Sequence, residues 1–153
     1  MKEIVGDIFS NTILNIADAI CITTNGFIKK DGTAVMGAGV AKIARDSFDG
    51  ISSDLAHLIK LNGNKVQIIR WMGYNKGEIA MIAFPTKHNF WEKSDIKLIE
   101  KSARQLKEMT DFHDWRKVIL PRPGCSNGKL SWIVDVKPVI EKILDDRFYL
   151  IQK

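Results

Sequence analysis

Two glycine-rich loops carry residue types that bind phosphate groups. The first covers residues 23–42, contains the sequence VMGAGVA at residues 35–41, and opens a helix. Small residues let a phosphate approach the backbone closely, and free N–H groups at a helix start present the positive end of the helix dipole to an anion. The segment therefore predicts a phosphate cradle formed by Gly37, Ala38, Gly39 and Val40. The alternative is that the glycines serve only a tight turn and helix–sheet packing.

The second loop has the sequence PRPGCSNGKLSW at residues 121–132 and directly follows an apolar strand segment. Its glycine, serine and asparagine residues can donate backbone and side-chain hydrogen bonds to phosphates. We expect the binding residues of this loop to be Gly124, Cys125, Ser126, Asn127 and Gly128. No glycine is followed by lysine and then serine or threonine at the spacing of a P-loop, which excludes that motif. A dinucleotide fingerprint is also a poor match, because the third glycine after Gly37 and Gly39 is missing.

Short apolar runs alternate with amphipathic segments along the chain. Strands are predicted at residues 2–9, 19–23, 66–72, 79–84, 117–120 and 148–151, and helices at 52–63, from 94 onward and at 138–144. The runs 66–72 and 79–84 flank a turn sequence and should pair antiparallel, while the first two strands are expected inside the sheet. The chain is therefore expected to be α/β, a three-layer α/β/α sandwich with a central mixed, mostly parallel sheet. Loops at the carboxyl ends of its parallel strands would meet at one edge.

The composition is that of a globular protein. The 153 residues are 45% hydrophobic and 27% charged, which predicts a single domain over residues 1–153. No apolar run approaches the roughly 20 residues of a membrane helix, and the first residues lack a signal-peptide pattern, so we expect a cytoplasmic protein without a membrane partner. Cys21 and Cys125 do not indicate a disulfide, and three scattered histidines predict no metal site. The formal net charge of +5 favours phosphorylated or polyanionic partners.

Taken together, these segments resemble the macrodomain family, which binds ADP-ribose, over nearly the whole chain. The matching segments are Gly6-Asp7-Ile8, Ala19 to Asn25, residues 35–41 and the loop at 121–132. The sequence Phe84-Pro85-Thr86-Lys87, with Trp91 and Ser94 after it, is similar to the branch that includes terminal ADP-ribose hydrolases and DarG-type antitoxins. The resemblance implies a macrodomain-like fold that needs no cofactor and acts on ADP-ribose or an ADP-ribosylated macromolecule.

The same resemblance implies a role for each matching residue. The Asp7 carboxylate would accept a hydrogen bond from the adenine amino group, the Ile8 backbone would position the base, and Asn25 would face the distal ribose. The two glycine-rich loops would hold the two phosphates from opposite sides. Without the family pattern, Asp7 and Asn25 would be interpreted as turn or helix-capping residues.

Lys87 and Asn25 are the candidate catalytic residues. In this branch the matching lysine is implicated in attack on the anomeric carbon of the distal ribose, which an amine can do only when it is unprotonated. The sequence departs from part of the branch at Gly128, where some hydrolases carry an acidic residue that helps to release the lysine-bound sugar. The DarG-type antitoxins, which remove ADP-ribose from modified DNA bases, resemble this chain in having Asn-Gly in the loop.

The leading hypothesis is a hydrolase that removes ADP-ribose from modified DNA or protein, with nucleic acid favoured by the basic net charge. One alternative is an ADP-ribose-1″-phosphate phosphatase, in which the loops stabilise the phosphate electrostatically. Another is a reader that binds ADP-ribose without turning it over. A monomer is expected. Trp91 is a candidate for stacking on a base, and Phe148 or Tyr149 could flank the adenine, but all three could equally be packing residues.

Overall fold

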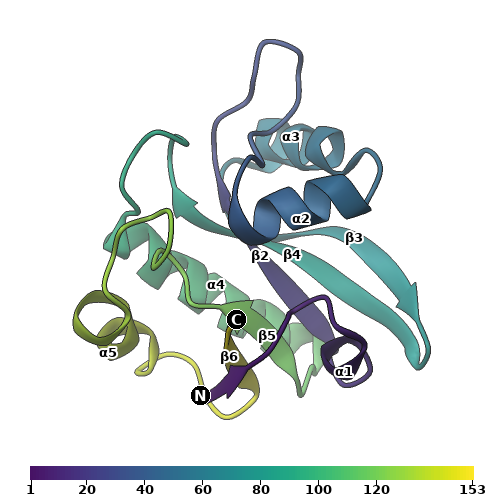
Figure 1. Ribbon diagram of the computed structural model, residues 1–153, viewed down its shortest axis with the longest axis vertical. Helices are drawn as coiled ribbons and strands as arrows, with labels where there is room; N and C mark the ends of the chain where they lie inside the picture. Colours follow the sequence, from purple (N-terminus) through teal and green to yellow (C-terminus); the bar gives the residue numbers. More distant parts are fainter.

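Six strands form one mixed sheet in the computed structural model, which describes residues 1–153 (Figure 1). The strands are β1 (Lys2–Val5), β2 (Ala19–Asn25), β3 (Gln67–Tyr74), β4 (Gly77–Lys87), β5 (Val118–Pro121) and β6 (Phe148–Gln152), in the order β1-β6-β5-β2-β4-β3. The helices are α1 (Asn11–Leu14), α2 (Gly39–Ser47), α3 (Ile51–Asn62), α4 (Ile96–His113) and α5 (Lys137–Ile140), with a π-helical turn, η1 (Trp132–Val136), directly before α5. None of the helices combines the length and apolar character that crossing a membrane requires.

All neighbouring strands run parallel except β3 and β4, which form an antiparallel hairpin. The prediction of a mixed, mostly parallel sheet is therefore confirmed, as is the pairing of residues 66–72 with 79–84. The hairpin turns between Tyr74 and Gly77, and the φ of +135° at Gly77 lies in a region that favours glycine.

Alternate side chains of the central strands point into two separate apolar layers. On one side of β4, Ile79 and Met81 pack with residues of α2 and α3. On the other side, Ile82 and Phe84 pack with residues of α4 and α5. Figure 1 shows these two helix pairs on opposite faces of the sheet. The predicted three-layer sandwich is thus confirmed, and helices 52–63 and 94 onward are present as α3 and α4.

The prediction of an inner strand over residues 2–9 is wrong in two respects. β1 ends at Val5 and lies at the edge of the sheet, where the Val5 side chain is 82% exposed. The Asp7 carboxylate then accepts a hydrogen bond from the Phe9 amide (2.9 Å), and Ser10 caps α1. Local side-chain hydrogen bonds of this kind compete with the strand ladder, so the apolar residues after Asp7 enter a turn and a short helix.

The helix predicted at residues 138–144 is shorter than expected. Pro138 lies in the first turn of α5, as its fixed φ favours, but the helix ends at Ile140. The chain continues in a tight turn, in which the amides of Ile143 and Leu144 both donate to the Ile140 carbonyl (3.0 and 2.9 Å). Both apolar side chains are still buried, so their pattern correctly indicated burial but not helix.

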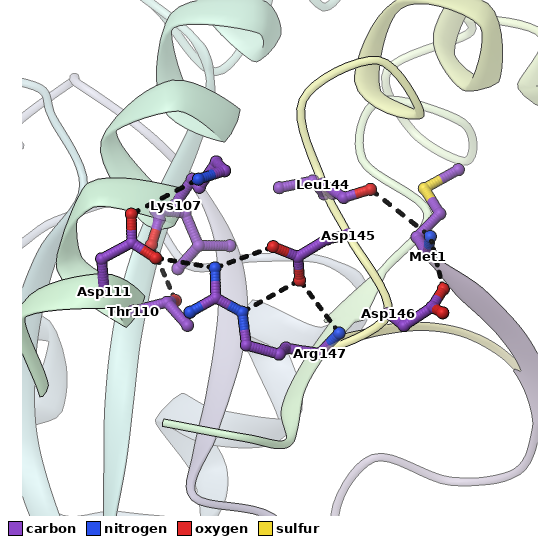
Figure 2. Close-up of polar contacts among 9 residues, drawn as sticks. Met1, Lys107, Thr110, Asp111, Leu144, Asp145, Asp146 and Arg147 are labelled. Carbon is purple, nitrogen blue, oxygen red and sulfur yellow. Dashed lines mark hydrogen bonds and ion pairs between the residues drawn. The ribbon is translucent and has the colours of Figure 1, made fainter. Parts of the chain in front are cut away.

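A network of charged side chains ties the turn before β6 to the end of α4 (Figure 2). The Arg147 guanidinium donates to Asp145 (2.8 and 2.9 Å) and Asp111 (2.7 Å), and these hydrogen bonds hold the pKa of both carboxyls below the usual range. A hollow of about 630 Å³ beside this network is lined by Asp114, Trp115, Arg116, Asp145, Asp146 and Arg147. It lies at the amino ends of β5 and β6, on the opposite sheet edge from the glycine-rich loops.

Replacing Asp18 with asparagine is expected to lower the free energy of unfolding at pH 7 by about 1–2 kcal/mol. The Asp18 carboxylate accepts the amides of Arg116 (2.8 Å) and Lys117 (2.9 Å) and pairs with Lys76 (3.3 Å). Burial alone would raise the pKa of this carboxyl, but the two backbone hydrogen bonds and the interaction with Lys76 together outweigh it and lower the pKa. A carboxyl with a depressed pKa stabilises the fold only while ionised, so the difference should vanish as the pH falls below about 4.

Urea unfolding of both proteins across this pH range measures the effect. Equal stability at pH 7, or a difference that persists unchanged in acid, would contradict the role given to Asp18.

Candidate functional site

Asn25 and Lys87 lie side by side at the carboxyl ends of two neighbouring parallel strands. They are paired residues of β2 and β4, and the register shifts by one residue just before this pair, between Thr24 and Asn25. A bulge at a strand end redirects the side chains that follow it. The two residues singled out from separate parts of the sequence therefore share one position on the sheet edge.

The Asn25 side chain anchors the first glycine-rich loop. Its Nδ2 donates to the Val35 carbonyl (3.1 Å), and its Oδ1 accepts the Phe27 amide (3.0 Å). These bonds give Asn25 the turn-forming role that its residue type favours on its own. An asparagine amide has two donor hydrogens and two acceptor lone pairs, so one of each stays available to a ligand.

Lys87 connects the end of β4 to the second glycine-rich loop. Its Nζ donates to the carbonyls of Asn127 (3.3 Å) and Phe90 (3.4 Å), and it forms no ion pair. The side chain is half-buried. The amine is therefore held by two neutral carbonyl groups, beside Asn25 and close to the loop expected to bind phosphate.

Asn64 fixes the backbone of Lys87 and was not predicted from the sequence. Its Nδ2 donates to the Lys87 carbonyl (3.0 Å), and a Cβ at Gly26 would come within 2.9 Å of the same amide group. Gly26 is thus required by the close approach of Asn64. The only signal in the sequence is an asparagine after a helix-ending glycine, which is too common to suggest this contact.

The first loop presents free backbone amides at the start of α2. Ala38, the residue before the helix, is extended, and no side chain caps the helix start. The N–H groups of residues 37–41 donate to no acceptor within the protein. Unpaired amides at a helix N-terminus form an anion-binding site. Gly39 has a φ of +58°, and a Cβ there would lie 3.7 Å from Asn127 Nδ2, so the two loops face each other.

The predicted residues of the second loop divide into a buried and an accessible group. Gly124 and Gly128 are buried, whereas Ser126 and Asn127 are exposed. Gly124 has a φ of +76°, and a Cβ there would come within 2.8 Å of the Ile99 side chain. The two glycines thus support the loop, and the exposed residues are the ones that can contact a ligand.

Position 128 has no room for a side chain. A Cβ at Gly128 would overlap the Ser94 hydroxyl and lie 2.6 Å from the Gly124 carbonyl oxygen. The Ser94 amide also donates to the Gly128 carbonyl (3.1 Å), which holds the segments together. The backbone of this loop therefore excludes the acidic residue that some hydrolases place here.

Cys125 does not supply a nucleophile at neutral pH. Its Sγ donates to the Pro123 carbonyl (3.3 Å), and burial raises the pKa of the thiol to about 11. A thiol with this pKa is almost entirely protonated at pH 7.

Asp7 and Ile8 lie at the far end of the same sheet edge. Three strand spacings separate β1 from β2, which corresponds to about 14 Å at the usual distance between strands. One Asp7 oxygen accepts the Phe9 amide, while the other has no partner and is exposed. The Ile8 side chain is buried in the core, so only its backbone can face a ligand. The edge from Asp7 to Asn25 is therefore long enough for an extended ligand.

The three aromatic candidates differ in how deeply their side chains are buried. Phe148 of β6 is fully buried in the apolar layer that also contains residues of α4 and α5, so it is a core residue. Tyr149 packs partly against the opposite core layer, with Lys2 Nζ 5.4 Å from its ring centroid. Trp91 is 63% exposed in the segment after β4, and it is the only one of the three with a widely accessible ring.

Comparison with known proteins identifies the fold. No family model and no curated protein matches the sequence. Among solved structures, Thermosipho africanus DarTG in complex with ADP-ribose aligns with a TM-score of 0.77 and 20% identity over 99% of this chain, which spans only 42% of that protein. The DarG macrodomains of Mycobacterium tuberculosis (TM-score 0.76, 20% identity) and Thermus aquaticus (0.73, 23%) each align over 99% of this chain and 97% of their own. The chain therefore has the macrodomain fold and resembles the DarG macrodomains in structure.

Proposed function

We propose that this chain binds ADP-ribose along the carboxyl edge of its sheet and removes it from a modified macromolecule. The observation that carries the proposal is the paired position of Asn25 and Lys87 beside two facing loops with free backbone amides. The fold agrees with it, because Thermosipho africanus DarTG, part of which aligns with this whole fold, has been solved in complex with ADP-ribose.

The ligand would extend from Asp7 to Lys87. The free Asp7 oxygen accepts the adenine amino group, and the amides of residues 37–40 hold the diphosphate together with the loop at 124–128. The remaining donor and acceptor of Asn25 then face the distal ribose. In this arrangement the anomeric carbon lies close to Lys87.

Lys87 would act as the nucleophile on that carbon. The neutral amine attacks C1″, the bond from C1″ to the macromolecule breaks, and the leaving atom takes a proton from water. The substituted amine gives one proton to the resulting hydroxide and the other to the ring oxygen as the sugar ring opens to an imine. Water then hydrolyses the imine to release ADP-ribose and regenerate the lysine. A protonated Lys87 would instead stabilise the departing charge electrostatically.

We infer that the macromolecule is a nucleic acid rather than a protein. The formal net charge of +5 favours a polyanionic substrate. Close to the site, Lys93 and Lys129 are exposed and form no ion pair, so their charges are available to phosphates.

A reader that binds ADP-ribose without turnover is the second candidate. The observation that favours it is Gly128, since the acid that assists sugar release in some hydrolases has no room there. The two functions predict equal binding and differ only in turnover of a modified substrate.

Calorimetric titration with ADP-ribose tests the proposed site, with AMP and NAD as controls. We expect ADP-ribose to bind at least about 10-fold more tightly than AMP, which lacks the second phosphate and the distal ribose. Absence of binding at millimolar ADP-ribose would refute the site. Incubation with ADP-ribosylated oligonucleotide and with ADP-ribosylated protein then separates a hydrolase from a reader and identifies the macromolecule.

A further inference from the structure

Two exposed aromatic side chains and a third, half-buried one form a contiguous cluster beside the proposed site. Phe27, Phe90 and Trp91, here called the aromatic platform, lie with their ring centroids 5.0–5.3 Å apart, and each pair is arranged edge to face. Phe90 is 45% exposed and Trp91 is 63% exposed. Because exposed aromatic surface is unfavourable in water, a cluster of this kind is typical of a binding surface.

The aromatic platform is joined to both candidate catalytic residues. The Phe27 amide donates to Asn25 Oδ1 (3.0 Å), and the Phe90 carbonyl accepts from Lys87 Nζ (3.4 Å). The Gly26 amide also donates to the His88 carbonyl (3.0 Å), which links the segments after β2 and β4. Figure 1 shows these segments extending from the same end of the sheet. A group attached to the distal ribose would therefore leave the site next to the platform.

Available positive charge flanks the aromatic platform. Lys29 and Lys30 follow Phe27, and Lys93 follows Trp91, and all three are exposed without an ion pair. Three carboxylates near these lysines in the sequence accept local hydrogen bonds. Asp95 contacts His88 Nε2 (3.0 Å). Asp31 accepts from Thr33, with its Oδ1 2.6 Å from the hydroxyl, and Glu92 accepts the Asn89 amide (2.8 Å).

We propose that the aromatic platform binds an unpaired nucleobase next to the modified nucleotide of a single-stranded nucleic acid. This inference rests on the proposed function. Stacking on aromatic faces, with lysines placed for the backbone phosphates, is how proteins hold single strands with little dependence on sequence. A base within a duplex presents only its edges to a protein, because its faces are covered by neighbouring pairs. The platform therefore selects single strands.

Fluorescence anisotropy with a labelled single-stranded oligodeoxynucleotide of about ten nucleotides tests the platform. The double variant Phe90→Ala/Trp91→Ala should bind it at least about 10-fold more weakly than the unmodified protein, and Trp91→Phe should retain most of the affinity. Trp71→Ala and Phe112→Ala are matched controls, because these aromatic residues are also exposed but belong to β3 and the end of α4. Both controls should bind normally.

ADP-ribose titration of the same proteins keeps the two proposals distinguishable. The double variant should bind free ADP-ribose with unchanged affinity. Equal oligonucleotide binding by the double variant and the unmodified protein would overturn the platform proposal. The proposal would also be overturned if the unmodified protein bound the matching duplex, or an uncharged peptide, as tightly as the single strand. If the unmodified protein binds the oligonucleotide through the platform but not ADP-ribose, the proposed function fails and the platform stands.

Discussion

Lys87→Ala is expected to slow the release of ADP-ribose from a modified oligonucleotide by about 10³-fold or more, with little change in affinity for free ADP-ribose. Removal of a nucleophile raises the barrier of the chemical step and leaves ground-state binding nearly intact. The Lys87 amine donates hydrogen bonds only to the carbonyls of Phe90 and Asn127, so its loss breaks no ion pair. Single-turnover kinetics and calorimetry measure the two quantities separately.

Two further variants define the role of the amine. Lys87→Arg keeps the positive charge but is not nucleophilic, so it should be as slow as the alanine variant if Lys87 attacks the sugar, and much faster if only charge matters. Lys93→Ala removes an exposed lysine nearby, and the single-turnover rate of this variant should equal that of the unmodified protein. Undiminished release of ADP-ribose by Lys87→Ala would exclude this residue as nucleophile. Turnover of ADP-ribose-1″-phosphate but not of the modified oligonucleotide, undiminished in Lys87→Ala, would instead favour the phosphatase.

The central strands of the sheet could be predicted from the sequence because their side chains are buried on both faces of the sheet. Residues 19–23 and 79–84 are continuously apolar, and they form β2 and β4 in the middle of the sheet. The helix at 52–63 had both a periodic apolar face and a glycine stop, and Gly63 does end α3. Apolar pattern and end signals agree in these elements, which makes their identification robust.

The peripheral elements were predicted less well because local hydrogen bonds decide them. Residues 2–9 continue the apolar pattern beyond Val5, but Asp7 turns the chain. A turn buries Ile143 and Leu144 as well as a helix would, so the apolar pattern did not define the end of α5. Apolar periodicity reports burial, and it determines secondary structure only where no competing backbone contact is available.

The glycine-rich loops could be recognised from residue type alone, whereas Lys87 and Asn64 could not. Glycine and alanine before a helix favour anion binding wherever they occur. One lysine in a basic chain has no distinguishing local signal, and Lys87 was singled out only by its resemblance to a family motif. Its pairing with Asn25 and its support by Asn64 depend on the register of β2 and β4 and on the end of α3, which are tertiary contacts.

Gly128→Asp is expected to lower the free energy of unfolding by about 1–3 kcal/mol and to weaken ADP-ribose binding by about 10-fold or more. The new side chain would overlap the Ser94 hydroxyl and press against the Gly124 carbonyl, which is backbone and cannot rotate away. Relief of this overlap requires movement of the whole loop at 124–128, and the loop would no longer face the start of α2. Urea unfolding and calorimetry measure both effects.

Asn127→Asp is the matched control, because it introduces the same carboxylate one residue earlier at an exposed position. It should unfold like the unmodified protein. If Gly128→Asp instead keeps native stability and speeds turnover, the loop tolerates an acid and this chain can use the assisted release of other hydrolases. If it behaves as expected, the glycine is required by the packing of Ser94 against Gly124. Hydrolysis of the lysine-bound sugar must then rely on water or on groups of the substrate itself.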